Sequence, residues 1–422
     1  MAQYGLIGEK LGHSFSKPIH EALADYTYEL MPMPMDEVFR FFEQRDFAAV
    51  NVTIPYKETV IPLCDEIDAH AEAIGAVNTV VNRGGKLYGY NTDFAGFLYT
   101  VKKLGVDPKD KKVLVLGSGG TCKTVSAVMR YCGAAEVTVV SRSGKNGAIT
   151  YEEAKTRNDT AILINASPCG MFPDNDGLPI DLDCFPKLCA VFDVIYNPLR
   201  TNLLLEAQKR GIPNIGGLLM LVAQAKFAVE HFLGISLDDS RIEEICGELM
   251  LKKRNLVLMG MPSCGKSTLG RIIAKETGRT FVDLDDEIVK EAGMDIPTIF
   301  AQKGELWFRE LEERVAARFS KENGIIIGCG GGTVLREASV RRLKQNGLLW
   351  FIDTPLSLLA GGNGRPLAKS KEQITALFEQ RTPIYRAAAD DTTVIPPDPP
   401  TVEGDFEHAM WIKERFYETA RG

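Results

Sequence analysis

The segment LVLMGMPSCGKSTLG, residues 256–270, decides how the second half of this chain folds. An apolar run leads into Gly260, and Gly265, Lys266 and Ser267 follow directly before a helix-like sequence. This spacing is typical of a loop whose backbone N–H groups wrap the phosphates of a nucleotide. At average residue frequencies it is expected by chance only about 0.02 times in a chain of this length. The segment therefore predicts a phosphate-binding loop between a strand and a helix.

A second glycine-rich loop lies upstream, in VLVLGSGGTCKTV (113–125). It contains four candidate cofactor-binding residues, Gly117, Ser118, Gly119 and Gly120. The loop departs from the full G-x-G-x-x-G pattern, because Cys122 stands where the third glycine would be. Its position between a strand-like and a helix-like run nevertheless favours a dinucleotide pyrophosphate at a helix N-terminus.

The strand that follows this loop ends in Ser141 and Arg142, where NAD-binding proteins carry an acidic residue. A carboxylate would repel the 2′-phosphate of NADP, whereas a guanidinium group attracts it. We therefore expect NADP(H) rather than NAD; the alternative is that Arg142 is only a solvated surface residue.

Length and charge limit the classes of protein to which the chain can belong. With 422 residues, the chain is expected to form two or three domains. Its net charge of −7 provides no basic field for nucleic acid or for an anionic membrane. It has no signal-like N-terminus and no apolar run of about 20 residues. The nine cysteines form no C-x-x-C pair and the five histidines have no metal-ligand spacing, so we expect a cytoplasmic protein with reduced thiols. Nothing in the sequence predicts the oligomeric state, a homodimer included.

Apolar strands and helix-like runs alternate twice along the chain, which predicts an α/β fold with parallel sheets covered on both faces. We expect a substrate-binding domain over 1–100 and 218–250, and a Rossmann-like NADP-binding domain over 101–217. A P-loop domain of the nucleoside-monophosphate-kinase type is expected over 255–422. The charged stretch 238–254 reads as a short, partly helical linker, and the Pro-rich segment 394–406 as a loop.

Seven motifs occur in the order in which they occur in shikimate dehydrogenases, and residues 4–250 resemble that family. They are GHSFSKPIH (12–20), NVTIPYK (51–57), GAVNT (75–79), GYNTDFAGF (89–97), LINASPCGM (163–171), DVIYNP (193–198) and GGLLMLVAQAKFAVE (216–230). Two details depart from the family: Lys17 separates the second serine from Pro18, and the glycine loop continues as GTCKT instead of with small residues.

The resemblance implies reduction of 3-dehydroshikimate, with Lys57 and Asp93 as the reactive pair. The chemistry agrees, because hydride transfer to a carbonyl carbon places negative charge on oxygen, where a proton donor is needed. The implied substrate-binding residues are Ser14, Ser16, Thr53, Asn78, Tyr196 and Gln224, with the two serines on the carboxylate. Asn165 and Gly217 join the expected cofactor-binding residues. Alternatives remain: Asp93 as a helix cap, Lys57 as a surface residue after a turn, and Tyr196 as a packing aromatic.

From Asn255 onward the chain resembles shikimate kinase. The motifs after the phosphate loop are FVDLDDEI (281–288), IFAQKGELWFRELEE (299–313), GCGGG (328–332), GRPL (364–367) and QRTPIYRAAA (380–389). The expected ATP-binding residues are Gly260, Ser263, Cys264, Gly265, Lys266, Ser267 and Thr268. Ser263 replaces a glycine that is common in this family's loop.

Ser267 and Asp283 are the expected Mg²⁺ ligands, because a hard cation prefers oxygen donors. We expect Asp285 to lie on the other side of an extended chain and to accept or orient the attacking hydroxyl. By resemblance, Arg309 and Arg381 bind the shikimate carboxylate and Arg365 stabilises the transferring phosphoryl group. The remaining substrate-binding residues implied in this half are Gly330, Gly331 and Gly332.

Together the two resemblances imply a bifunctional enzyme that reduces 3-dehydroshikimate with NADPH and then phosphorylates shikimate with ATP. The first product is the second substrate, which explains why one chain has two nucleotide loops. Two alternatives stay open: a quinate/shikimate dehydrogenase fused to a kinase for another small polyol, or a chain with one inactive domain that regulates the other.

Overall fold

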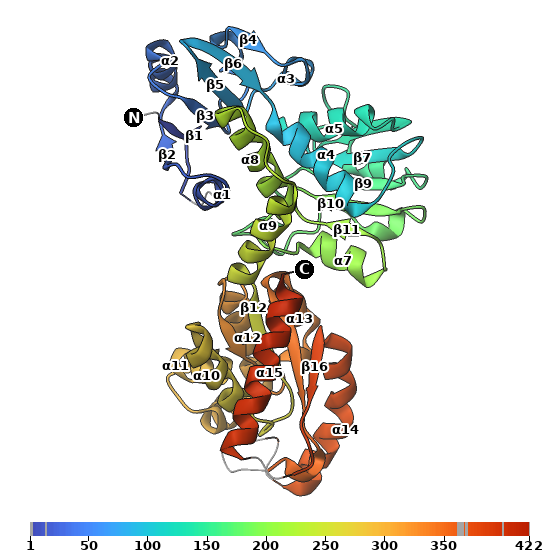
Figure 1. Ribbon diagram of the computed structural model, residues 1–422. Helices are drawn as coiled ribbons and strands as arrows, with labels where there is room; N and C mark the ends of the chain where they lie inside the picture. Colours follow the sequence, from blue (N-terminus) through green and yellow to red (C-terminus); the bar gives the residue numbers. More distant parts are fainter. Residues whose placement is uncertain (1–2, 13–14, 361–366, 368–369, 399–400, 422) are drawn as a thin grey trace. The chain divides into compact units, whose positions relative to one another are not determined.

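A computed structural model describes residues 3–12, 15–360, 367, 370–398 and 401–421 (Figure 1). Ser14 and Arg365 lie outside the described residues. The chain divides into two compact units. The first unit comprises residues 1–197 and 206–246, and the second comprises residues 198–205 and 247–422. No described helix is both long and apolar enough to span a membrane.

The first unit contains a six-stranded sheet in the order β2-β1-β3-β5-β6-β4. Its strands are β1 (Tyr4–Gly8), β2 (Tyr28–Pro32), β3 (Ala49–Val52), β4 (Glu66–Ile67), β5 (Thr79–Arg83) and β6 (Lys86–Tyr90). Only β5 runs antiparallel to its neighbours, β3 and β6. The helices of this part are α1 (Ser16–Leu23), α2 (Met35–Gln44) and α3 (Ala69–Ile74).

The second sheet of the first unit is parallel throughout, in the order β11-β10-β9-β7-β8. Its strands are β7 (Lys112–Leu116), β8 (Glu136–Val140), β9 (Ile162–Asn165), β10 (Ala190–Asp193) and β11 (Asn214–Ile215). Helices α5 (Gly120–Tyr131) and α6 (Tyr151–Lys155) belong to this part. Buried side chains along β7 and β9, such as Val115 and Ile164, confirm the predicted sheet.

Two long helices of the first unit, α4 (Thr92–Leu104) and α8 (Gly217–Leu233), pack side by side (Figure 1). The contact is close because Gly96 of α4 has no side chain. A Cβ atom there would lie 2.9 Å from the backbone N of Gln224. These helices therefore place Asp93, on the first turn of α4, near Gln224 on α8.

A buried histidine anchors α1 to the six-stranded sheet. The His20 ring stacks on Tyr28 with 4.0 Å between ring centroids, and its Nδ1 lies 2.7 Å from the Tyr26 hydroxyl. Burial lowers the pKa of His20 to about 3, because the charged imidazolium would lose its hydration. His20 is therefore neutral in the folded protein at neutral pH.

We expect acid to destabilise the first unit through His20. The unfolded histidine binds a proton below pH 6.5 and the folded one does not, so this contribution is complete above pH 6.5 and is lost as the pH falls toward 3. Between pH 7 and pH 5 the loss from this group is about 2 kcal/mol. His20→Phe should reduce the pH dependence of the unfolding free energy by about that amount. An unchanged dependence in the variant would contradict this assignment.

The measurement can separate the units, because the chain has 3 tryptophans, Trp307, Trp350 and Trp411, all in the second unit. Urea unfolding is followed by circular dichroism and by tryptophan fluorescence. A transition seen by circular dichroism without a fluorescence change reports the first unit.

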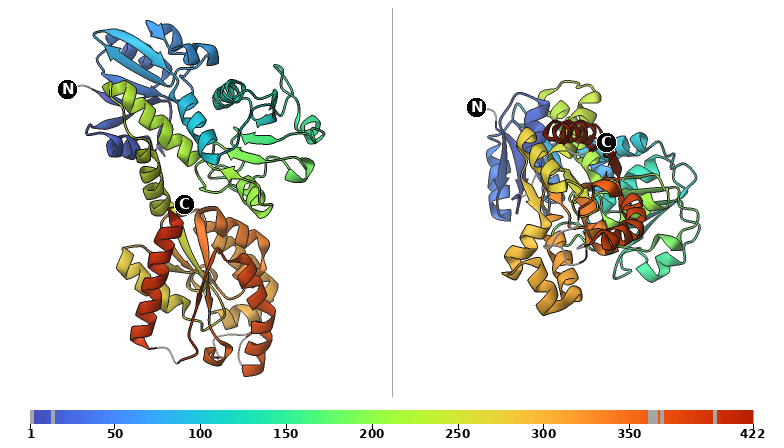
Figure 2. Two further views of the ribbon diagram at one scale, coloured as in Figure 1. Left: turned by 45° about the vertical axis from the view of Figure 1, so that its right-hand side comes forward. Right: turned by 90° about the horizontal axis from the view of Figure 1, so that it is seen from below.

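The second unit contains a five-stranded parallel sheet in the order β13-β14-β12-β15-β16. Its strands are β12 (Asn255–Met259), β13 (Phe281–Asp283), β14 (Ile326–Gly328), β15 (Gly347–Asp353) and β16 (Asp391–Val394). The helices are α10 (Lys266–Thr277), α11 (Leu284–Ala292), α12 (Ile296–Phe319), α13 (Glu337–Asn346), α14 (Lys371–Ala388) and α15 (Val402–Ala420). In the left view of Figure 2 the strands lie between α15, in red, and α14, in orange-red.

The core of the second unit lies on both faces of this sheet. The buried strands β12 and β15 contribute Leu258 and Trp350, and the Trp350 indole donates a hydrogen bond of 2.7 Å to the hydroxyl of Thr393. Burying strands on both faces requires nearly continuous apolar sequence, which is the pattern of residues 347–352. The predicted parallel sheet of the second half is confirmed.

One local prediction differs from the structure, whereas the predicted helical character of the linker agrees with it. The Pro-rich segment 394–406 is a loop only in part, because α15 begins at Val402 after Thr401, whose side chain accepts a hydrogen bond from the backbone N–H of Gly404. The predicted linker 238–254 is almost entirely helical, as α9 (Ser240–Lys253). The division between the units falls within α9, after Cys246.

The short segment 198–205 groups with the second unit, whereas sequence analysis assigned it to the NADP-binding domain. Its first four residues precede α7 (Asn202–Lys209), and its last four residues are the beginning of that helix. The backbone N–H of Leu199 donates to the side-chain oxygen of Asn346 at 3.0 Å, and the Arg200 guanidinium donates to the carbonyl oxygen of Lys344 at 2.9 Å. These hydrogen bonds explain the grouping.

Candidate functional sites

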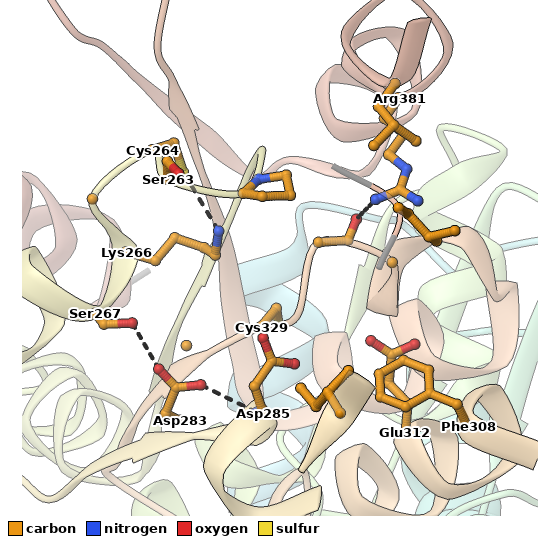
Figure 3. A pocket seen from close by; sticks show the side chains of 18 of the residues that line it. Ser263, Cys264, Lys266, Ser267, Asp283, Asp285, Phe308, Glu312, Cys329 and Arg381 are labelled. Carbon is orange, nitrogen blue, oxygen red and sulfur yellow. Dashed lines mark hydrogen bonds between the residues drawn. The ribbon is translucent and has the colours of Figure 1, made fainter. Parts of the chain in front are cut away.

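The predicted phosphate loop joins β12 to α10 (Figure 3). Gly260 has φ +150° and Gly265 has φ +90°, backbone angles that favour glycine. Lys266 begins α10, and its ammonium group donates hydrogen bonds to the carbonyl oxygens of Gly260 at 3.1 Å and Met261 at 2.9 Å. It also lies 3.5 Å from Cys264 Sγ. The loop therefore holds its lysine at the helix N-terminus, where phosphate binding is favoured.

Ser263 adopts a left-handed backbone conformation, with φ +69°, although it is not a glycine. This conformation is uncommon for a residue with a Cβ atom. Its hydroxyl donates a hydrogen bond of 2.7 Å to the carbonyl oxygen of Ala360. Ser263 thus adopts a strained backbone conformation, and its hydroxyl contacts Ala360.

Two aspartates meet the loop at the carboxyl end of β13 (Figure 3). The Ser267 hydroxyl donates to Asp283 Oδ2 at 2.7 Å, and the backbone N–H of Asp285 donates to Asp283 Oδ1 at 3.1 Å. The expectation of an extended chain here is wrong: Asp283 caps α11, which begins at Leu284. Both aspartates line one cavity.

The electrostatic surroundings distinguish Asp285. Burial raises the pKa of Asp285 to about 6, with further increases from the nearby charges of Asp283 and Glu312. A carboxylate with a raised pKa is a better proton acceptor than an exposed one. Ser267 and Asp283 instead present paired oxygen atoms, the donor type that suits Mg²⁺.

Arg309, predicted to bind a carboxylate, lies on α12 and lines the same cavity. Its Nη1 atom donates to Glu312 Oε2 at 2.7 Å, and Glu312 Oε1 accepts a hydrogen bond of 2.8 Å from the Thr333 hydroxyl. Glu312 lines this cavity as well, and it was not among the predicted site residues. Its position three residues after Arg309 on a helix was the available signal, because such residues share one face.

The glycines of GCGGG permit close approach of side chains to the backbone. A Cβ atom on Gly332 would lie 1.9 Å from Arg309 Nη1, and one on Gly330 would lie 2.6 Å from Asp285 Oδ1. The carbonyl oxygen of Gly331 accepts hydrogen bonds from Arg381 Nη1, at 3.1 Å, and from the Tyr385 hydroxyl. A side chain at Gly330 or Gly332 would therefore collide with a residue that lines the cavity.

A cavity of about 430 Å³ connects the phosphate loop to the two arginines. Its apolar wall includes Ile296, Phe300, Phe308 and Leu377. Of the predicted residues, the structure brings together Ser263, Cys264, Gly265, Lys266, Ser267, Thr268, Asp283, Asp285, Arg309, Gly331, Gly332 and Arg381 around it. Gly260 and Gly330 adjoin this cavity through the contacts given above.

The first unit has a cavity of about 410 Å³ lined by seven of its predicted residues. They are Ser16, Thr53, Lys57, Asn78, Asp93, Tyr196 and Gln224. Lys57 Nζ lies 2.6 Å from Asp93 Oδ2, and the two side chains are only 19% and 14% exposed. Lys57 is therefore not a surface residue.

Asp93 does not cap α4. The cap is Asn91, whose side-chain oxygen accepts a hydrogen bond of 3.1 Å from the backbone N–H of Phe94. Asp93 lies in the first helical turn and is left to pair with Lys57. Tyr196 lines the cavity, and its ring also contacts the ring of Phe15 edge-on, with 5.7 Å between ring centroids. Tyr196 is therefore both a cavity residue and a packing aromatic.

A buried hydrogen-bond network holds Asn78 in this cavity. Asn78 Oδ1 accepts from the backbone N–H of Thr92 at 2.7 Å, which leaves its amide N–H groups for other partners. Asn51, which also lines the cavity, donates to the carbonyl oxygen of Asn78 at 3.2 Å and accepts from the Tyr28 hydroxyl at 2.7 Å. Asn51 was not among the predicted site residues, although it lies within the motif NVTIPYK.

The predicted cofactor loop lies between β7 and α5. Gly117 has φ +106°, and a Cβ atom there would lie 2.8 Å from the carbonyl oxygen of Ala166. Gly119 precedes α5 without a side-chain cap, and open space lies next to Gly119 and Gly120. An uncapped helix N-terminus facing open space fits a pyrophosphate.

The other predicted cofactor residues have different environments. Ser141 accepts a hydrogen bond of 3.1 Å from the backbone N–H of Gly144, and Arg142 is exposed at the end of β8. Asn165 is fully buried and donates to Asp193 at 3.1 Å. Gly217 begins α8, where a Cβ atom would lie 2.0 Å from the carbonyl oxygen of Val194. Asn165 and Gly217 thus shape the site, whereas Arg142 is available to a charged ligand.

One ion pair links the two parts of the first unit beside the cavity. Lys123, on the first turns of α5, donates to Glu58, the residue after Lys57. A cation near a helix N-terminus is unfavourable unless an anion lies nearby, and Glu58 supplies that anion. The lysine of GTCKT, a motif that departs from the family pattern, therefore contacts the residue next to Lys57.

The folds and sites define a dinucleotide-dependent oxidoreductase joined to a P-loop phosphotransferase. Residues 6–80 match the family model of the shikimate dehydrogenase substrate-binding domain, and residues 262–400 match that of shikimate kinase. Over 267 residues the chain is 36% identical to the NADP⁺ shikimate dehydrogenase of Clostridium perfringens strain 13. The aligned region covers 59% of this chain and 98% of that protein. The chain belongs to the shikimate dehydrogenase family, and it is a fusion with a shikimate kinase domain.

Two solved structures resemble the first part of the chain. A chorismate mutase/shikimate 5-dehydrogenase fusion protein from Clostridium acetobutylicum is 35% identical to this chain, with a TM-score of 0.54. The superposed region covers 58% of this chain and 96% of the chain in that structure. The shikimate 5-dehydrogenase of Thermus thermophilus, solved with NADP(H) and shikimate, is 31% identical, with a TM-score of 0.53. It covers 58% of this chain and 98% of its own.

Proposed function

We propose that this chain performs two consecutive reactions on one metabolite. The first unit reduces 3-dehydroshikimate to shikimate with NADPH, and the second unit transfers a phosphoryl group from ATP to shikimate, giving shikimate 3-phosphate. The observation that carries the proposal is the presence in one chain of a Lys57–Asp93 pair in one cavity and of Lys266 and Asp285 in another.

In the first reaction, Lys57 donates a proton to the carbonyl oxygen of the substrate as negative charge develops there. Asp93 orients the Lys57 ammonium through their 2.6 Å contact. When bound, NADPH supplies the hydride that reaches the carbonyl carbon. Thr53, Asn78 and Gln224 orient the ring hydroxyls by hydrogen bonds, and Ser16 binds the carboxylate, as does Ser14, which lies outside the described residues.

In the second reaction, Asp285 accepts the proton of the shikimate hydroxyl as its oxygen bonds to the γ-phosphorus and the bond to ADP breaks. Lys266 neutralises phosphate charge, and Arg309 and Arg381 bind the shikimate carboxylate. Mg²⁺, when bound by Ser267 and Asp283, neutralises further negative charge on the phosphates. Arg365 keeps its predicted role on the phosphoryl group, outside the described residues.

We further propose a substrate-binding domain over 1–100 and 218–250, an NADP-binding domain over 101–217 and a kinase domain over 255–422. Support comes from the three separate sheets, although residues 198–205 group with the second unit. A cytoplasmic location is proposed because all nine cysteines are free thiols. No contact among the described residues supports a homodimer.

One assay tests both activities. The chain is mixed with 3-dehydroshikimate, NADPH and ATP, and we expect loss of NADPH absorbance together with release of ADP. Omitting NADPH should stop ADP release, because no shikimate then forms, and adding shikimate should restore it. Loss of one activity would support the alternative of an inactive, regulatory domain. Faster oxidation of quinate than of shikimate would support the quinate alternative.

A further inference from the structure

The cavity of the first unit contains a cation to which the proposed reaction assigns no role. Lys10 lines this cavity together with Ser16 and Lys57. It lies in the turn after β1, which ends at Gly8, and its side chain is exposed to solvent. Because a lysine side chain is flexible, its ammonium group can move toward an anionic ligand that binds in the cavity.

The charges that line the cavity do not cancel. Among its described lining residues the titratable groups are Lys10, Lys57, Asp93 and Tyr196. Lys57 and Asp93 neutralise each other at 2.6 Å, and burial raises the pKa of Tyr196, which keeps its hydroxyl neutral at pH 7. No ion pair involves Lys10 within residues 3–12, 15–360 and the later described segments. The cavity lining therefore carries one uncompensated positive charge.

Lys17, the lysine that interrupts the family's serine–proline sequence, does not supply this charge. It forms an ion pair with Glu21 at 3.4 Å on the surface of α1, and it does not line the cavity. Lys10 and Lys17 thus have the same charge and lie seven positions apart in the sequence, but only one of them faces the cavity.

We propose that Lys10 is a specificity-determining residue that attracts and binds the carboxylate of the substrate; this inference rests on the proposed function of the first unit. The chain has a net charge of −7, so an anionic substrate is not drawn to the protein as a whole and needs a local cation. Serine hydroxyls bind a carboxylate as neutral donors, whereas an ammonium group adds a charge-assisted hydrogen bond, which is stronger.

The test compares Lys10→Gln with Lys17→Gln in the full-length chain. For 3-dehydroshikimate, Lys10→Gln should raise KM by about three- to fivefold at low salt, the range expected of one solvent-accessible charge pair, with kcat unchanged. The difference from the wild type should shrink at high salt because ions screen the attraction. Lys17→Gln should leave KM unchanged. An unchanged KM in Lys10→Gln would overturn the proposal.

A neutral substrate separates a charge effect from a structural effect. With the methyl ester of 3-dehydroshikimate, the wild type and Lys10→Gln should have equal KM values, because the carboxylate charge is absent. An equal rise in KM for the acid and the ester would overturn the proposal, since the substitution would then act through cavity shape. If the wild-type chain reduced neither compound, the proposed function itself would fail, and the two failures are thereby distinguished.

Discussion

Replacing Lys57 by alanine is expected to lower kcat/KM for 3-dehydroshikimate reduction by about 10²–10⁴-fold, the usual contribution of a positioned proton donor. The variant loses the ammonium group that pairs with Asp93 in the cavity and leaves that carboxylate without its partner. Negative charge that develops on the substrate oxygen would then have neither a proton donor nor a cation beside it. The rate is measured from the decrease in NADPH absorbance.

The kinase activity of the same preparation is the internal control, because Lys57 and Lys266 lie in different units. Lys86→Ala is the matched control variant, because Lys86 is an exposed lysine of β6 in the same unit and pairs with Glu66, and exposed ion pairs contribute little to stability. If both activities of Lys57→Ala fell together while circular dichroism remained that of the wild type, the assignment of independent sites would be wrong.

Replacing Lys266 by alanine is expected to lower the kinase rate by about 10²–10³-fold and to leave the reduction of 3-dehydroshikimate unchanged. Lys266 is the only lysine among the described residues that line the kinase cavity. Without Lys266 the phosphates would still receive hydrogen bonds from backbone N–H groups. They would lack the cation that neutralises their negative charge during phosphoryl transfer. ADP release in the presence of shikimate measures the effect.

The matched control for this prediction is Lys275→Ala. Lys275 is exposed in the last turn of the same helix, α10, so its removal changes the charge of the helix without changing the phosphate loop. A kinase that worked at the full rate after Lys266→Ala would exclude the phosphate-loop assignment. Equal losses in both variants would indicate damage to α10 instead.

The sequence predicted most of the secondary structure and both glycine loops, and short edge elements were missed. The strand β16 (Asp391–Val394) and the start of α15 at Val402 fell in or beside a segment that its prolines marked as a loop. Short edge strands carry little periodic signal, because one side of the strand has no partner and few of its residues are buried. A long helix such as α8 gives a clearer signal, because its apolar pattern extends over several turns.

Most predicted site residues that a family motif names line the two cavities, whereas some neighbouring cavity residues were not predicted. Glu312, Asn51 and Lys10 contact or accompany predicted residues, but no motif distinguishes them from ordinary polar residues. The geometry of Asp283 and Asp285 was predicted wrongly for two reasons. Residues two apart in an extended chain lie on the same side of it, and the chain is not extended here because Asp283 caps α11.

The sequence by itself determined the two alternating α/β halves, the two phosphate-binding loops and the family to which the chain belongs, because these depend on residues close together in the chain. Only the tertiary structure decided that Lys57 faces Asp93 across 36 positions, that Glu312 joins Arg309 to Thr333, and that Lys10 rather than Lys17 lines the substrate cavity. The physical reason is that a cavity is formed by segments distant in sequence. The direction of each side chain toward it depends on how those segments pack, which no local pattern encodes.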